Sequence, residues 1–283
     1  MPDLERLLDR IGIDTPPPAD LGGLRAVHRA YLDRVPYETL TIHLGESAPL
    51  DLDGLEARLL DGGRGGYCFE LNGLLGWLLE ELGFTVERRE ARVGPRGADE
   101  DPTNHLALVV GLPGEPGRWL ADAGLGEGWV EPLALLPGVQ AGAGRLGWTL
   151  ERLPRGWWIA HHPWGGFPGI TVHEDPVGLD AFAPHHARLS CDPASPFQRA
   201  LVVQRVDDHA ITTLRARTLT RRGPDVDERR VLADRSDLAA TLRAAFGIEP
   251  GALGEERLGR LWRRVCDQHA AWTAAAGAQP LEP

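Results

Sequence analysis

Residues 64–72, with the sequence RGGYCFELN, constrain the fold more than any other stretch of this chain. They follow Gly62 and Gly63 and run into a series of leucines at positions 71, 74, 75, 78, 79 and 82, a spacing that predicts one buried face of an α-helix ending at Gly83. Cys68 therefore lies in the first turn of this helix. Unpaired N–H groups and the positive end of the helix dipole favour a thiolate there. The position suits a nucleophile, if a base can reach it.

Two polar residues downstream could supply the base and its partner. His105 begins the apolar segment HLALVV, and Asp122 lies in a second strand-like segment, residues 118–124, after the turn sequence PGEPG. If the two segments form a hairpin, His105 and Asp122 lie roughly opposite each other, within two or three residues of register. The order Cys, His, Asp matches a nucleophile, a base and the acid that orients it. The competing interpretations are an inert buried Cys68 and a hydrogen-bonded histidine at a strand entrance.

Composition excludes several classes of protein. A chain of 283 residues with 42% hydrophobic content can bury a sizeable core, and its net charge of -11 argues against nucleic acid or an anionic membrane as partner. No lysine is present, so a phosphate-bearing ligand must be held by arginine, histidine or backbone N–H groups. Without a signal peptide pattern or a long apolar run, we expect no membrane association and a cytoplasmic location.

The remaining cysteines and histidines carry no recognisable site. Three cysteines are too few and too dispersed for a disulfide framework, so we expect Cys191 and Cys266 to be buried structural residues. The adjacent His161 and His162 point to opposite faces of a strand and lack a ligand spacing. We therefore expect no metal site.

Hydrophobic periodicity divides the chain into three expected domains. Residues 1–84 form a helical bundle carrying the nucleophile, with a short extended piece after Pro36 and helices at 3–11, 20–34, 53–60 and 68–83. Residues 85–192 form a β-barrel of short strands carrying His105 and Asp122, with 175–192 irregular. Residues 193–283 form an α/β unit with a strand pair at 200–206 and 210–216 and helices at 238–246 and 258–276.

The motifs quoted above resemble those of the arylamine N-acetyltransferases, in the same order and at similar spacing. Further matches are VPYETL at 35–40, similar to the family's VPFENL, and SPF at 195–197 followed by LVVQR. The resemblance spans about residues 3–250. It implies an α+β fold with an N-terminal helical bundle, a central β-barrel and a C-terminal α/β lid, around a papain-like core of Cys68, His105 and Asp122.

The implied activity is transfer of an acetyl group from acetyl-CoA, as co-substrate, to the nitrogen of a small-molecule arylamine or arylhydrazine. It would run through a Cys68 acyl-enzyme with ping-pong kinetics and without a metal. The family also places the segment of Gly124, Gly126 and Gly128 beside the acyl donor, although glycine spacing alone equally fits a plain turn.

Other implied residues concern the acceptor pocket and the loop before Cys68. Leu125 stands where the family usually has Phe, and Tyr37 replaces another Phe. With Phe197, these two are expected to line the acceptor pocket and to alter its preference among amines. An ion pair between Glu38 and Arg64 is expected to clamp the loop before Cys68.

Two alternative functions remain open at this point. Amide synthases of the same fold, which release a polyketide chain from a carrier protein by forming a macrolactam, resemble the family across the same motifs. The arginine-only basic residues and abundant Ala, Gly and Pro would suit a producer of such compounds. A catalytically silent binding protein is the second alternative, and the intact Cys, His and Asp set argues against it.

Overall fold

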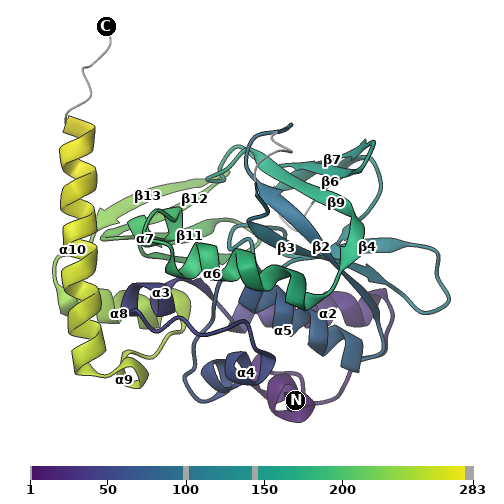
Figure 1. Ribbon diagram of the computed structural model, residues 1–283, viewed down its shortest axis with the longest axis horizontal. Coiled ribbons are helices and arrows are strands. Elements are labelled where there is room, and N and C mark those ends of the chain that lie inside the picture. The colour runs from purple at the N-terminus through teal and green to yellow at the C-terminus, as the bar shows by residue number, and fades with distance from the viewer. Residues whose placement is uncertain (1, 98–101, 142–145, 278–283) are drawn as a thin grey trace, which may run out of the picture.

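The computed structural model describes residues 2–97, 102–141 and 146–277, and combines helices with two antiparallel sheets (Figure 1). The helices are α1 Leu4–Ile11, α2 Leu21–Arg34, α3 Leu40–Leu44, α4 Leu52–Leu60, α5 Cys68–Glu81, α6 Ala183–Cys191, α7 Pro196–Arg199, α8 Arg235–Phe246, α9 Pro250–Leu253 and α10 Glu255–Gly277. A 3-10 helix, Leu179–Phe182, precedes α6. Figure 1 shows α10 at one side of the molecule and the strands of the larger sheet at the other, above α2 and α5.

Aspartate caps begin three of the N-terminal helices. Asp3, Asp20 and Asp51 each accept a backbone N–H bond from the first turn of α1, α2 and α4, which satisfies a donor that the helix itself cannot pair. The four helices expected in this region are confirmed. The expected extended piece after Pro36 was wrong in part, because it contains α3, whose five residues are too few to show a helical period.

The larger sheet is a curved, barrel-like array, as the sequence predicted, and its eight strands lie in the order β5-β4-β3-β2-β9-β8-β7-β6. Its strands are β2 Thr85–Val93, β3 His105–Gly111, β4 Arg118–Ala121, β5 Leu133–Ala134, β6 Gly138–Ala141, β7 Gly147–Leu153, β8 Gly156–Ala160 and β9 Gly169–Val177. The irregular stretch expected at 175–192 was wrong, because β9 extends to Val177 and α6 fills most of the rest. Pro184 lies at the start of α6, where a missing N–H costs nothing.

The smaller sheet joins one strand from the N-terminal part of the chain to four strands from its C-terminal part. Its order is β1-β10-β11-β12-β13, with β1 Tyr37–Glu38, β10 Val202–Val206, β11 Ile211–Arg215, β12 Thr218–Gly223 and β13 Val226–Val231. The predicted strand pair corresponds to β10 and β11. Tyr37 pairs with Gln204 and Glu38 with Val203, so β1 binds the N-terminal helices to the C-terminal sheet. The three-domain division stays a prediction.

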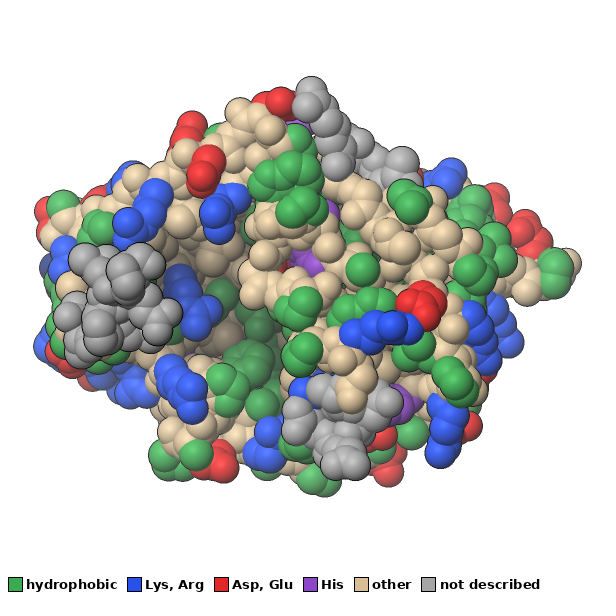
Figure 2. Space-filling model, turned by 90° about the horizontal axis from the view of Figure 1, so that it is seen from above, with side chains coloured by type: hydrophobic (Ala, Val, Ile, Leu, Met, Phe, Trp, Pro, Cys, Tyr) green, Lys and Arg blue, Asp and Glu red, His purple; other side chains and the backbone are tan. Residues whose placement is uncertain are grey.

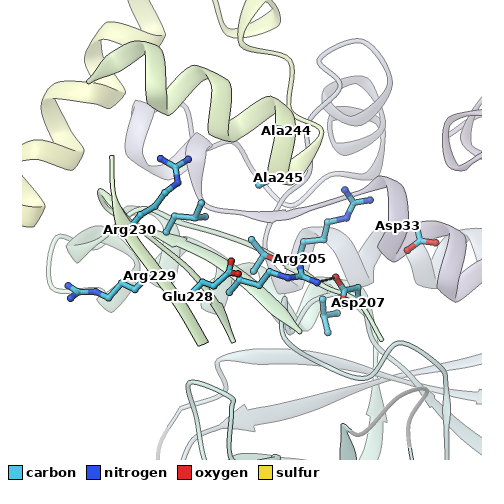
Figure 3. Close-up of a pocket in the computed structure, with 12 residues that line it drawn as sticks. Asp33, Arg205, Asp207, Glu228, Arg229, Arg230, Ala244 and Ala245 are labelled. Atoms are coloured by element: carbon cyan, nitrogen blue, oxygen red, sulfur yellow. Dashed lines mark hydrogen bonds and ion pairs between the residues drawn. The ribbon is translucent and has the colours of Figure 1, made fainter. Parts of the chain in front are cut away.

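The two faces of the smaller sheet line different cavities. Neighbouring residues of a strand point to opposite faces, and the cross-strand registers assign each residue to a row. One row lines a groove beside α10 and consists of Gln204, Thr213, Thr220 and Arg229. The other row lines a cavity under α8, where Ala244 and Ala245 form part of the wall (Figure 3), and consists of Arg205, Thr212, Arg221 and Glu228. Only the first row faces the side of the molecule that carries Cys68.

Candidate active site

Cys68 is the first residue of α5, as its sequence context predicted. Tyr67 is the extended residue before the helix, and its N–H donates to Glu70 Oε2 at 3.1 Å, so the third helical residue fixes the entry of the chain. Glu70 Oε1 in turn lies 2.7 Å from an Arg58 nitrogen. A Cβ atom on Gly65 would overlap the Pro36 carbonyl oxygen, so only glycine allows this loop to approach so closely.

His105 and Asp122 meet beside this helix. His105 Nε2 lies 2.7 Å from Asp122 Oδ2, and both side chains are buried. His105 begins β3, while Asp122 directly follows β4. Leu108 pairs with Ala121, and extending that register would set Gly124 opposite His105. The observed register thus differs from the expected pairing of His105 with Asp122 by two residues, which is within the expected uncertainty of two or three residues.

Asn72 connects the helix to Asp122 and was not identified from the sequence. It lies one helical turn after Cys68 and is fully buried. Its Nδ2 donates to Asp122 Oδ1 at 2.9 Å and to the Leu106 carbonyl at 2.6 Å, and its Oδ1 accepts the Ala123 N–H at 2.9 Å. Asn72 therefore holds α5, β3 and the end of β4 at fixed positions. The sequence signal that could have identified Asn72 is its polar amide on a helix face that otherwise consists of leucines.

His28 supports the same aspartate from the opposite side. The Asp122 N–H lies 3.0 Å from His28 Nε2, and His28 Nδ1 lies 3.3 Å from the Val130 carbonyl. These partners require a proton on Nδ1 and a free Nε2, the neutral form. Burial also lowers the pKa of His28. His28 was not identified from the sequence; it lies on the buried face of α2 with Leu24 and Val27, and no sequence pattern linked it to Asp122.

The electrostatics of Cys68 oppose a free thiolate. Burial, followed by the negative charge of Asp122, raises the pKa of the Cys68 thiol, and the Phe69 N–H lowers it only in part. The helix position that favours a thiolate is thus present, but desolvation outweighs it. The thiol lies 3.5 Å from the Asn104 carbonyl oxygen. A thiolate in this site needs a positive partner, and His105, in the same cavity, is the candidate.

Cys68 and His105 face a cavity of about 300 Å³. Tyr37, Leu125 and Phe197, the residues expected around an acceptor, also line it. Further lining side chains that the sequence did not reveal are Glu127, Gln204 and Arg215. The space-filling view of this side shows an opening near the middle of the surface with a histidine side chain inside it (Figure 2). Tyr37, Leu125 and Phe197 remain proposed substrate contacts.

Close packing accounts for two of the three glycines after Asp122. A Cβ atom on Gly124 would lie 2.7 Å from Cys68 Cα, and Gly126 has φ +70° with its Cα facing Gln204 and Tyr37. Both positions therefore exclude larger residues. Gly124 lines the cavity, whereas Gly128 packs against Leu125. Contact of these glycines with an acyl donor stays a prediction.

Glu38 and Arg64 form a buried ion pair. Arg64 Nη2 and Nε lie 2.8 and 3.1 Å from Glu38 Oε1, and Arg64 Nη2 also donates to Thr41 Oγ1 at 3.0 Å. The second Glu38 oxygen accepts the Leu40 N–H. The pair connects the loop before Cys68 to the region of β1 and α3.

Three further expectations concerned the burial of two cysteines, a metal site and membrane-spanning helices. Cys191 is exposed and Cys266 half-buried, so their expected burial was wrong. Within the described ranges, His, Cys, Asp and Glu form no group of three or more suited to a metal ion. None of the helices in those ranges is long and apolar enough to cross a membrane.

A larger groove adjoins the cavity. It has a volume of about 690 Å³ and runs between the smaller sheet and the end of α10. Glu127, Gly166, Ala200, Gln204 and Arg215 line both spaces, so the groove leads toward Cys68. Its walls also carry three further arginines, Arg199, Arg222 and Arg229, and the indole rings of Trp164 and Trp272. Arginine side chains border the hollow at the left of Figure 2.

Comparison with known proteins assigns the family. The N-acetyltransferase family profile matches residues 20–252. An arylamine N-acetyltransferase of Mycolicibacterium smegmatis is 35% identical over 257 residues, covering 89% of this chain and 94% of the relative, and one of Mycobacterium tuberculosis is 31% identical over 261 residues, covering 89% and 92%.

Solved structures agree with these relatives. The M. smegmatis arylamine N-acetyltransferase has a TM-score of 0.83 at 34% identity, and the Mycobacterium marinum enzyme in complex with CoA has a TM-score of 0.84 at 30% identity. Each comparison covers 93% of this chain and 98% of the solved one. The chain therefore belongs to the arylamine N-acetyltransferase family.

Proposed function

We propose that this protein is an arylamine N-acetyltransferase, which transfers the acetyl group of acetyl-CoA to the nitrogen of an arylamine or arylhydrazine. The observation that carries the proposal is the buried pair of His105 and Asp122 beside Cys68, at the inner end of a cavity joined to a larger groove. Cys68 acts as nucleophile, His105 as base and acid, and Asp122 orients the imidazole and stabilises its charged form.

The first half-reaction acetylates the enzyme. His105 takes the Cys68 proton, and the resulting thiolate attacks the thioester carbonyl of acetyl-CoA, so a new C–S bond forms. The bond between the carbonyl and the CoA sulfur then breaks, and CoA leaves as a thiol with the proton that His105 returns. The Phe69 N–H, in the first turn of α5, lies close to the Cys68 sulfur and suits the negative oxygen of the intermediate.

The second half-reaction transfers the acetyl group to the amine. The nitrogen of an arylamine is largely unprotonated at neutral pH and attacks the carbonyl carbon of the acetyl-Cys68 thioester. A C–N bond forms, the bond to Cys68 Sγ breaks, and His105 carries the proton from nitrogen to the sulfur. Exclusion of water from the buried site protects the thioester from hydrolysis.

The larger groove is the proposed place of the CoA moiety. Because the chain has no lysine, the phosphates of CoA require arginine or backbone donors. This groove is lined by Arg199, Arg215, Arg222 and Arg229. The indole rings of Trp164 and Trp272 offer apolar surface for the adenine. The M. marinum enzyme was solved with CoA bound, which supports a CoA site in a protein of this fold.

The macrolactam-forming alternative gains no support from the comparisons. The relatives and solved structures described above are acetyltransferases that cover nearly the whole chain. A carrier-protein partner likewise has no support. Small-molecule amines remain the proposed acceptors.

The direct test uses purified protein, acetyl-CoA and aniline. Acetyl-CoA alone should add the mass of one acetyl group to the intact protein, and addition of aniline should restore the original mass and yield acetanilide. Cys68→Ala should abolish the mass change, whereas Cys191→Ala, which alters an exposed cysteine outside the cavity, should keep it. Acetylation of the Cys68→Ala variant, or none of the wild type, would contradict the proposal.

A further inference from the structure

The carboxyl group of Glu127 lies where the Cys68 cavity adjoins the larger groove. Glu127 belongs to the loop after Asp122, is 6% exposed and lines both the Cys68 cavity and the larger groove. Its Oε1 accepts the Gly166 N–H at 2.8 Å, and its Oε2 lies 3.4 Å from Gln204 Nε2. Both of these partners are uncharged.

Glu127 differs in this respect from the other buried glutamates near the site. Glu38 and Glu70 each pair with an arginine, at 2.8 and 2.7 Å. Among the described residues, no arginine or histidine nitrogen lies within ion-pair distance of the Glu127 carboxylate. A dehydrated carboxylate without a directly paired cation favours a positive ligand and repels a negative one.

The size of the cavity brings the ring substituent of an amine near its walls. The reacting nitrogen must approach the acetyl group on Cys68, and the cavity of about 300 Å³ leaves an aromatic ring little freedom. A substituent on the ring then contacts a wall remote from the nitrogen. Glu127 contributes a charge to these walls, and Arg215 contributes the opposite charge from an exposed position, where water and salt screen it.

We propose that Glu127 selects the acceptor by charge, favouring arylamines with a cationic ring substituent and disfavouring arylamines with a carboxylate. The inference rests on the proposed acetyltransferase activity and names the amine class within it. Burial raises the pKa of Glu127 to about 7, while the Gly166 N–H and then Arg215 act in the opposite direction. Glu127 is therefore mostly protonated at pH 6 and mostly ionised at pH 8.5, so the selection should strengthen as pH rises.

Other groups that face Glu127 do not share this titration. His161 Nε2 contacts the Glu127 carbonyl at 3.1 Å, and burial lowers the pKa of His161 to about 4. Burial raises the pKa of Tyr37, from β1, well above its ordinary value. Both stay neutral between pH 6 and 8.5, and the guanidinium group of Arg215 lines the same cavity from β11. Cys68 is acetylated when the amine binds. The Glu127→Gln variant distinguishes an effect of Glu127 from an effect of His105, which lies in the same cavity.

The test compares three acceptors at pH 6 and pH 8.5: neutral aniline, 4-aminobenzoate and the permanent cation (4-aminophenyl)trimethylammonium. In ping-pong kinetics, kcat/KM for the amine reports only the second half-reaction, so a ratio of two amines at one pH cancels the acetylation step. From pH 6 to 8.5, the 4-aminobenzoate to aniline ratio should fall about tenfold in the wild type, and the cation to aniline ratio should rise about as much, as expected for unit charges in a partly screened site.

Glu127→Gln should make both ratios nearly independent of pH, because the amide cannot ionise but can still accept the Gly166 N–H. Glu131→Gln, which changes the partly exposed partner of Arg25, is the matched control and should keep the wild-type dependence. Wild-type ratios that do not change with pH overturn the inference, even if the variant fails to fold. A dependence that persists in Glu127→Gln also overturns it and assigns the effect to His105. Absence of acetylation of all three amines would instead refute the proposed function.

Discussion

Asn72 and Asp122 are joined by a 2.9 Å hydrogen bond between the helix of the nucleophile and the acid that orients the base. The bond crosses from α5 to the residue after β4 and joins two residues that are 50 positions apart in the sequence. Because Asn72 and Cys68 share one face of α5, the amide relates the sulfur position to the carboxylate position. We infer that Asn72 is a positioning residue.

Asn72→Ala should reduce both stability and activity. The substitution leaves the Leu106 carbonyl and the Ala123 N–H without their buried partner, which costs about 1–3 kcal/mol per group in unfolding free energy. Activity should fall further than stability explains. Urea unfolding and kcat/KM for aniline would be compared with Thr241→Ala, which also removes a buried hydrogen-bonding side chain but lies in α8, outside the cavity and the groove. A variant with wild-type kcat/KM would refute the positioning role.

Cys68 should react as an ion pair and not as a free thiolate. Burial and Asp122 raise the pKa of its thiol, so ionisation near neutral pH depends on the transfer of its proton to His105. Alkylation by iodoacetamide should be rapid at pH 7 in the wild type and slow in His105→Ala. In that variant the reaction should appear only well above pH 8.5, the pKa of an ordinary thiol, because burial and Asp122 still raise the pKa of Cys68.

Peptide mapping would assign the label, with exposed Cys191 as the internal reference in the same sample. Equal alkylation rates of Cys68 in the wild type and in His105→Ala would show that His105 does not activate it. A wild-type Cys68 that reacts only above pH 8.5 would argue against the nucleophile assignment itself.

The extent to which the sequence predicted the fold follows from where its periodicity is strong. The α5 helix combines a leucine stripe with a glycine start, and both bounds were predicted to within two residues. By contrast, β13 is exposed on most residues and rich in charge, so it lacks the alternation that marks a half-buried strand. The helix α6 was missed because Pro184 and two histidines interrupt its apolar pattern.

The residues of the candidate site likewise divide into those that a local motif predicts and those that no local motif predicts. Cys68, His105 and Asp122 could be found because each accompanies a local motif. Glu127, Gln204 and Arg215 come from three separate segments and meet only through the packing of the smaller sheet against the loop after Asp122. No local pattern encodes such a meeting, so sequence reasoning could not assemble that wall of the cavity.

The ion pair between Arg64 and Glu38 should matter more for stability than for chemistry. Arg64→Ala would leave Glu38 buried without its counterion, at a cost of about 3–5 kcal/mol in unfolding free energy. The Arg64→Ala/Glu38→Ala double variant should lose less than the sum of the two single variants, since no unpaired charge remains. Chemical denaturation of the four proteins measures this coupling. Additive losses would show that the two charges do not stabilise each other.

Buried histidines should make the fold sensitive to mild acid. Burial lowers the pKa of His43 to about 4 and that of His162 to about 3, below the ordinary value near 6.5. Below pH 6.5 the unfolded chain therefore binds protons that the folded chain does not. The stability present above pH 6.5 should be lost as pH falls toward these lower pKa values.

His162→Phe offers a matched test of this acid sensitivity. Neither ring nitrogen of His162 has a partner among the described residues, and its ring packs against Trp148 and Trp164. Phe should therefore fit. The pH slope of the unfolding free energy between about 6.5 and 4 should decrease by about one proton. An unchanged slope would show that His162 is protonated in the folded state.

Leu125 concerns the shape of the acceptor cavity, where this chain departs from the pattern of its family. The side chain is 5% exposed and lines the cavity with Cys68, so Phe in its place would narrow the space and add a stacking face. Leu125→Phe should lower kcat/KM for 2-naphthylamine relative to aniline by about threefold to tenfold, because the narrower space excludes the second ring more strongly than the added stacking face, worth about 0.5–1.5 kcal/mol, attracts it. Leu136→Phe, at a position that is 64% exposed, is the matched control. Because both amines react with the same acetyl-enzyme, their ratio isolates the fit of the ring. If Leu125→Phe leaves the ratio unchanged, Leu125 does not contact the acceptor, and the amine must enter along another wall of the cavity.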